Sequence, residues 1–136
     1  MAEQTSLQRE QIQQLLNQAR ELVHKDAASG LEFANEAHSL YQSLDHDQED
    51  SLEAEIYLAL GKLFVQLANF GKAYKRLNEA RALFEKLEDV NKQIDCWHVL
   101  STAHFRFGEP KDSMHTSLRT LELLKRSPNK ACFRRL

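Results

Sequence analysis

The chain has 136 residues, of which 42% are hydrophobic, and its formal net charge of −2 argues against a general nucleic-acid binder. A chain of this length forms one compact domain or a short repeat array, and we treat residues 1–136 as a single domain. Few glycines (4) and prolines (2) favour helices joined by brief turns. The 2 cysteines are too few for a disulfide framework. We expect no membrane span, signal peptide or disulfide, and hence a cytoplasmic location.

Charge is distributed unevenly along the chain. Residues 1–60 contain 3 Lys or Arg and 12 Asp or Glu, whereas residues 106–136 contain 8 and 3. The basic residues toward the end include Arg119, Lys125, Arg126, Lys130, Arg134 and Arg135. Apart from Phe133, no aromatic side chain is interleaved with them, so we interpret this end as a solvated tail. Contact with nucleic acid or anionic lipid is the less favoured alternative.

A first helix hairpin is predicted over residues 6–45. Thr5 and Gln8 have the spacing of a capping box at its start. The apolar positions then recur every three or four residues, at Leu15, Leu16, Ala19, Leu22 and Val23. Residues 27–30 indicate a turn, and Ser29 is placed to cap the second helix together with a glutamate three residues later.

A second hairpin, over residues 51–89, has the clearest pattern in the chain. Its first helix has one face made of Tyr57, Leu60, Gly61 and Phe64. Its second helix has a face made of Ala73, Leu77, Ala80, Leu83, Phe84 and Leu87. Asn69 is a good N-cap for that second helix. The small side chains of Gly61 and Ala80 predict a close approach of the two helices.

A third hairpin is predicted over residues 91–127, followed by a tail over residues 128–136. Trp97, Leu100 and Ser101 lie 40 residues after Tyr57, Leu60 and Gly61. Pro110 suits the first turn of the last helix, where a missing N–H costs nothing, and the helix should end near Pro128. An internal repeat also links the first two hairpins, because Asn-Glu-Ala-His-Ser-Leu-Tyr at 35–41 resembles Asn-Glu-Ala-Arg-Ala-Leu-Phe 43 residues later.

These spacings resemble the tetratricopeptide repeat. The residues Tyr57-x2-Leu60-Gly61-x2-Phe64, Ala73-x3-Leu77 and Ala80 occupy its pattern of small and large positions. The resemblance implies an all-α fold of three stacked antiparallel helix hairpins in a right-handed solenoid. It also implies a scaffold for protein–protein interaction. The repeats are longer than usual and resemble those of bacterial regulators, including sensor regions that precede diguanylate cyclase domains.

The residue types of enzymes and metal sites are present without the required spacing. Cys96, His98 and His104 do not share a helix face, so we expect no metal or other cofactor. Asp112, Ser113, His115 and Ser117 lack a pocket and a strained nucleophile turn, so we expect no catalytic triad and no enzyme activity. The acidic segment 45–50 lacks the glycine of a calcium loop.

The surface made by the first helix of each hairpin is the expected partner site. The residues expected to contact a partner lie beside the structural positions of the repeat. They are Leu16, Arg20, Glu55, Leu58, Lys62, Val65, Asp95, His98, Thr102 and Phe105. A mixture of apolar, cationic and anionic groups suits a peptide, a partner helix or a downstream domain of the same chain. A solvated helix face is the alternative for each residue taken singly.

A second surface is predicted on the last helix, where Met114, Leu118, Leu121 and Leu124 form an apolar face. A terminal repeat needs a polar cap, so this face predicts self-association, with a symmetric dimer as the favoured geometry. The function we expect is a regulatory module of a bacterial signalling protein. The alternatives are a stand-alone adaptor with a chaperone-like role and a helical domain that senses a peptide.

Overall fold

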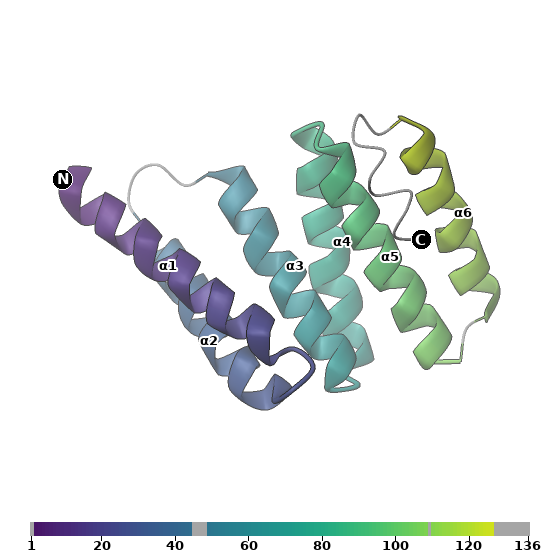
Figure 1. Ribbon diagram of the computed structural model, residues 1–136, viewed down its shortest axis with the longest axis horizontal. Coiled ribbons are helices and arrows are strands. Elements are labelled where there is room, and N and C mark those ends of the chain that lie inside the picture. The colour runs from purple at the N-terminus through teal and green to yellow at the C-terminus, as the bar shows by residue number, and fades with distance from the viewer. Residues whose placement is uncertain (1, 45–48, 109, 127–136) are drawn as a thin grey trace.

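The computed structural model describes residues 2–44, 49–108 and 110–126 (Figure 1). Within these ranges the chain forms six helices and no strand, which confirms the all-α prediction. The helices are α1 (Ala2–Leu22), α2 (Ala27–Gln42), α3 (Asp50–Gln66), α4 (Phe70–Lys86), α5 (Val90–Arg106) and α6 (Pro110–Arg126). None of these helices combines the length and the apolar character needed to cross a membrane.

Consecutive helices pack as three hairpins, α1 with α2, α3 with α4 and α5 with α6. Neighbouring hairpins then meet through α2 and α3 and through α4 and α5. The first helices also touch in sequence, α1 with α3 and α3 with α5, and they form the side nearer the viewer in Figure 1. This side is where the partner surface was predicted.

The two turns that flank α4 share one backbone design. Ala68 and Glu88 both adopt left-handed φ angles, of 58° and 57°. The next residue in each turn donates its N–H to a carbonyl five residues back, Asn69 to Phe64 at 2.9 Å and Asp89 to Phe84 at 3.0 Å. This pattern is the Schellman motif, which satisfies carbonyl groups at the end of a helix.

The same two turn residues cap the helices that follow. Asn69 accepts a hydrogen bond from the backbone N–H of Lys72 at 3.4 Å, which confirms the predicted N-cap of α4. Asp89 accepts from the N–H of Lys92 at 3.1 Å and caps α5 in the same way. Each turn therefore closes one helix and opens the next within three residues.

The first hairpin begins and turns differently from the prediction. Helix α1 already includes Ala2, so Thr5 does not start it. Residues 27–30 belong to α2 rather than to a turn, and its N-cap is Asp26, whose carboxylate accepts from the Ser29 N–H at 3.3 Å and from the Ser29 hydroxyl at 2.7 Å. Ser29 is thus the donor of the capping bond and not the cap. These bonds lower the pKa of the Asp26 carboxyl group.

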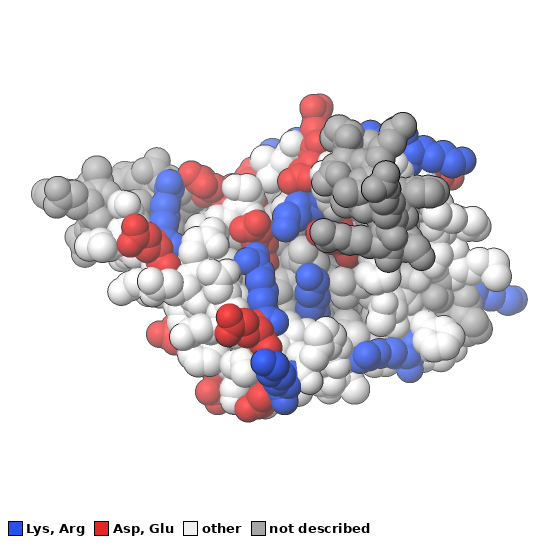
Figure 2. Space-filling view, viewed as in Figure 1, with Lys and Arg blue, Asp and Glu red and all other residues white. Residues whose placement is uncertain are grey.

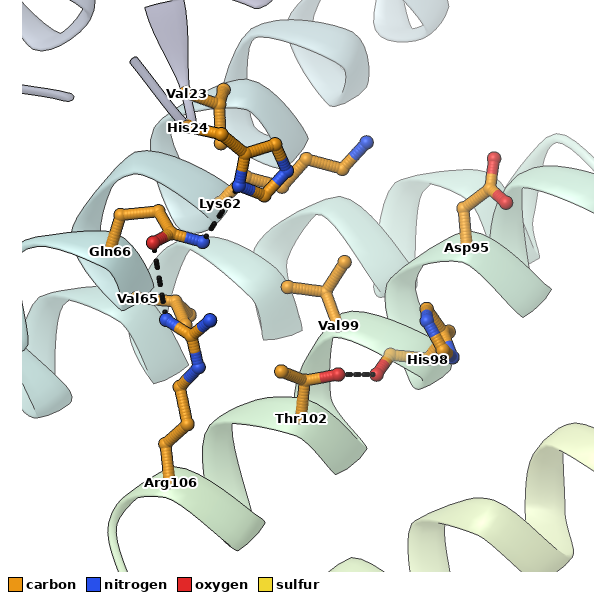
Figure 3. A pocket seen from close by; sticks show the side chains of 10 residues that line it. All are labelled: Val23, His24, Lys62, Val65, Gln66, Asp95, His98, Val99, Thr102 and Arg106. Atoms are coloured by element: carbon orange, nitrogen blue, oxygen red, sulfur yellow. Dashed lines mark hydrogen bonds between the residues drawn. The ribbon is translucent and has the colours of Figure 1, made fainter. Parts of the chain in front are cut away.

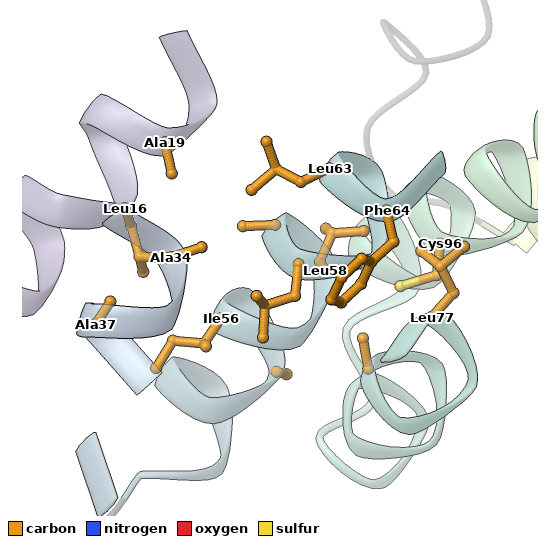
Figure 4. Packing of buried hydrophobic residues seen from close by; sticks show 14 of the residues in the cluster. Leu16, Ala19, Ala34, Ala37, Ile56, Leu58, Leu63, Phe64, Leu77 and Cys96 are labelled. Atoms are coloured by element: carbon orange, nitrogen blue, oxygen red, sulfur yellow. The ribbon is translucent and has the colours of Figure 1, made fainter. Parts of the chain in front are cut away.

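The core is centred on α3, which contacts helices on several sides. Ten of its residues are buried, among them Ile56, Leu58, Leu63 and Phe64 (Figure 4). Gly30 of α2 packs against this helix, because a β-carbon built on it would lie 2.8 Å from Cδ2 of Leu63. Gly30 is therefore a close-packing residue within a helix, although its sequence context indicated a turn.

Candidate protein-interaction groove

A groove with a volume of about 390 Å³ lies between the end of α1 and the helices α3 and α5. We define the groove by its ten lining residues: Val23, His24, Lys62, Val65, Gln66, Asp95, His98, Val99, Thr102 and Arg106. Their side chains surround one space, with the valines beside the polar groups (Figure 3). The groove is built by α3, by α5 and by the two residues that directly follow α1.

One edge of the groove is a chain of polar contacts across three helices. Arg106 of α5 donates to Oε1 of Gln66 at 3.2 Å, and Nε2 of Gln66 lies 3.3 Å from Nδ1 of His24 (Figure 3). Gln66 therefore links the end of α1 to the end of α5. Since these contacts are between side chains, they hold the edge without occupying backbone groups.

Lys62 is a charged group of the groove that has no direct ion-pair partner among the described residues. Its side chain is half-buried, and it makes no hydrogen bond or ion pair with any residue that the structure describes. Burial lowers the pKa of Lys62, and the neighbouring cations Lys92 and Arg20 lower it further, whereas Asp95 acts in the opposite direction. A desolvated cation without a partner favours an anionic group that enters from outside.

Three other charges of this face are mutually paired. Glu55 lies 3.9 Å from Arg20 and 3.9 Å from Lys92, so one carboxylate serves two cations from neighbouring helices. The space-filling view of the same side shows Lys and Arg interleaved with Asp and Glu over its middle (Figure 2). This face is therefore mixed in charge, and Lys62 is a half-buried cation on it that has no ion pair among the described residues.

Five of the predicted partner-binding residues line the groove. They are Lys62, Val65, Asp95, His98 and Thr102. Arg20 and Glu55 lie outside the lining, although they take part in the ion pairs just described. Thr102 directs its hydroxyl to the carbonyl oxygen of His98 at 3.2 Å, within its own helix.

Three predicted positions do not line this groove. Leu58 is 5% exposed and Leu16 is fully buried, so both belong to the core. Leu58 is buried because α3 contacts helices on more sides than its amphipathic pattern indicates. Phe105 is 74% exposed but does not line the groove.

Five lining residues were missed by the sequence analysis: Val23, His24, Gln66, Val99 and Arg106. Helical spacing could have found three of them. Gln66 lies four residues after Lys62, Val99 four after Asp95 and Arg106 four after Thr102, so each continues a predicted face by one turn. His24 had no such signal, because its place depends on where α1 ends.

Residues considered for chemistry have other contacts in the structure. Cys96 is fully buried, and burial raises the pKa of its thiol to about 12. Oγ of Ser117 lies 2.7 Å from Oγ of Ser101, across the contact of α5 and α6. The side chains of Asp112 and Ser113 lie outside the described residues. Among the side chains that are described, no three His, Cys, Asp or Glu residues are placed to hold a metal ion.

The apolar face of α6 is exposed in part. Met114, Leu118 and Leu121 are 67%, 56% and 46% exposed. Leu124 is only 4% exposed and packs with Ile94 and Leu123, so its assignment to an exposed face is wrong. Self-association through the three exposed residues stays a prediction, which sedimentation of the wild-type chain and of Leu118→Glu with Leu121→Glu can test. Residues 128–136, which the tail prediction concerns, lie outside the described residues.

No protein-family model, no curated protein and no solved structure matches this chain. The groove and the surfaces described above are therefore interpreted from their own geometry.

Proposed function

We propose that this protein is an interaction scaffold that holds a segment of a partner protein in the groove of α1, α3 and α5. The observation that carries the proposal is the half-buried, unpaired side chain of Lys62 in a lining that also contains the apolar side chains of Val65 and Val99. Such a site suits a segment with an acidic group and an adjacent apolar group. The order of contacts between hairpins and the repeat pattern around Gly61 support a right-handed solenoid like that of tetratricopeptide repeats.

The volume of the groove suits an extended segment rather than a folded domain. Its volume of about 390 Å³ is close to that of sites that hold a few side chains. His24 and Arg106 at one end and Asp95 at the other offer polar contacts for the backbone of such a segment. A regulatory module and a free adaptor would both use this groove, so the two functions differ in the partner and not in the site.

A displayed library of random peptides, panned against the purified chain, tests the proposal. We expect enriched peptides to contain an acidic residue next to an apolar one, and to lose binding to Lys62→Glu. Lys125→Glu makes the same charge change on the exposed surface of α6 and is the matched control, for which binding should be kept. Enrichment that is equally strong on Lys62→Glu would contradict the groove as the binding site.

A further inference from the structure

A second pocket lies between α2 and α4, away from the lining of the groove. It has a volume of about 270 Å³ and is lined by Leu31, Asn35, Phe64, Lys72, Lys75 and Arg76. We call it the α2/α4 pocket. None of these six described lining residues is acidic, and three of them are cations from two turns of one helix.

The two lysines of the α2/α4 pocket are poorly compensated. Lys72 and Arg76 are four residues apart and Lys72 and Lys75 are three apart, so like charges face each other along α4. Neither lysine pairs with a carboxylate among the residues that the structure describes. Arg76 does pair with a carboxylate, since its Nη1 lies 3.5 Å from Oε2 of Glu79.

Two of the three cations, Lys72 and Arg76, are nevertheless held in place by aromatic rings. Nζ of Lys72 lies 5.7 Å from the centroid of Phe64, and the guanidinium of Arg76 lies 5.0 Å from the centroid of Tyr57. Cation–π contacts of this length orient a side chain without neutralising its charge. The positive charges therefore stay available to a ligand while their positions are restricted.

The backbone of α4 adds to the positive electrostatic potential of the pocket. Helix α4 begins at Phe70, so Lys72 and Lys75 lie in its first two turns, near the positive end of the helix dipole. Asn35 reaches the pocket from α2 with an amide group that can donate a hydrogen bond. Leu31 and Phe64 supply an apolar wall beside these donors.

We propose that the α2/α4 pocket binds a phosphate group carried by a small organic part, such as a phosphorylated side chain or a free phosphomonoester. Lys72, Lys75 and Arg76 would neutralise the phosphate, Asn35 would donate to one of its oxygens, and the organic part would lie on Leu31 and Phe64. A phosphate matches this pocket better than a single carboxylate does, because its charge at neutral pH approaches −2 and it has three acceptor oxygens. This site is independent of the groove and of its proposed partner.

Amide NMR of the labelled full chain, titrated first with inorganic phosphate and then with O-phosphoserine, tests this proposal. We expect saturable shifts at Asn35 and in the first turns of α4, and tighter binding as the pH rises from 6 to 7.5 and phosphate becomes a dianion. Lys72→Gln with Lys75→Gln should weaken the affinity about tenfold or more, since charge-assisted hydrogen bonds are lost. Both lysines are exposed, so this variant should keep its melting temperature.

Lys125→Gln removes a charge from α6 and is the matched control; it should change the affinity less than about twofold. Shifts that do not saturate, or an equal loss in Lys125→Gln, would show only diffuse charge attraction and would overturn the proposal. A phosphoserine peptide that binds more tightly than free phosphoserine would identify a protein ligand, and equal affinities would identify a small phosphomonoester. Lys62→Glu should leave phosphate binding unchanged, which separates this test from that of the groove.

Discussion

Gly61 of α3 lies directly against Leu77 of α4, so closely that a β-carbon on the glycine would be 2.5 Å from Cδ2 and 2.6 Å from Cγ of the leucine. Leu77 is fully buried, so a displaced side chain would have to push into the core. The close approach predicted from the sequence at Gly61 is confirmed, and its partner is Leu77.

Gly61→Ala should therefore destabilise the fold by about 1–3 kcal/mol, because the added methyl group displaces Leu77. Leu77→Ala alone should cost about 2–5 kcal/mol through the cavity it leaves. In the Leu77→Ala background, the cost of Gly61→Ala should shrink, since the two residues share one space. Chemical denaturation of the wild type, the two single variants and the double variant gives the coupling free energy between the two residues.

Gly71→Ala is the control for the change of glycine to alanine. It lies in α4, with no atom within 4 Å of an added β-carbon. There the substitution should raise stability by about 0.5–1 kcal/mol, as helix propensity dictates. Equal effects of Gly61→Ala and Gly71→Ala would contradict the packing described for Gly61.

Glu53 joins two tyrosines at the contact of α2 and α3. It accepts hydrogen bonds from Tyr57 at 2.8 Å and from Tyr41 at 3.3 Å. Glu53→Gln replaces one carboxylate oxygen by an amide donor, so we expect a loss of about 1–2 kcal/mol in the free energy of unfolding. Glu36→Gln, on the exposed surface of α2, removes the same charge and should cost less than about 0.5 kcal/mol.

The same tyrosines predict a loss of stability in alkali. Burial, with Glu53 beside it, raises the pKa of Tyr57 to about 12 and also raises that of Tyr41. A group whose pKa is higher in the folded state contributes stability that is complete below the unfolded value of 10.0 and declines as the pH rises toward 12. Melting curves between pH 9 and 11.5 should show a smaller decline for Tyr57→Phe. An identical decline would contradict this linkage.

Ala68 adopts a left-handed φ of 58°, a conformation that costs an alanine about 1–2 kcal/mol. The equivalent turn after α5 uses Gly108, whose φ is 78°. Ala68→Gly should raise stability by about 0.5–1 kcal/mol after the entropy of the unfolded chain is subtracted. Ala82 is an exposed residue in the interior of α4, so Ala82→Gly should instead lower stability by about 1 kcal/mol. If the melting temperature shifts in the same direction for both variants, the left-handed conformation assigned to Ala68 is refuted.

Cys96 should resist thiol reagents while the protein is folded. With a pKa of about 12, its thiolate fraction at pH 8 is about one in ten thousand, and the sulfur is also buried. In a Cys132→Ser variant, labelling by an aromatic disulfide should require denaturant and follow the unfolding curve. Rapid labelling in buffer would show that the α3–α5 contact opens locally.

The sequence predicted the helices more successfully than the surfaces. Apolar spacing located all three hairpins, and Asn69 marked the start of α4, because periodicity and capping are local properties. Ser29 was misjudged because Asp26, three residues earlier, competes for the same capping role. Leu58 was misjudged because its burial depends on how many helices surround α3. The amphipathic pattern of one helix does not contain that information.

Lys62 should limit the stability of the protein, because its ammonium group is desolvated without a partner in the described chain. Lys62→Met keeps an unbranched side chain and removes the charge, so we expect a gain of about 0.5–2 kcal/mol at pH 7. The lowered pKa means that the unfolded state binds this proton more readily, so the penalty present at neutral pH disappears as the pH approaches 10.5. The gain in melting temperature should therefore shrink between pH 7 and 10.5. Lys92→Met is the control: it removes a lysine that lies 3.9 Å from Glu55, and it should bring no gain. If Lys62→Met melts at or below the wild-type temperature at pH 7, Lys62 is already compensated, and an acidic ligand has no unmatched charge to meet in the groove.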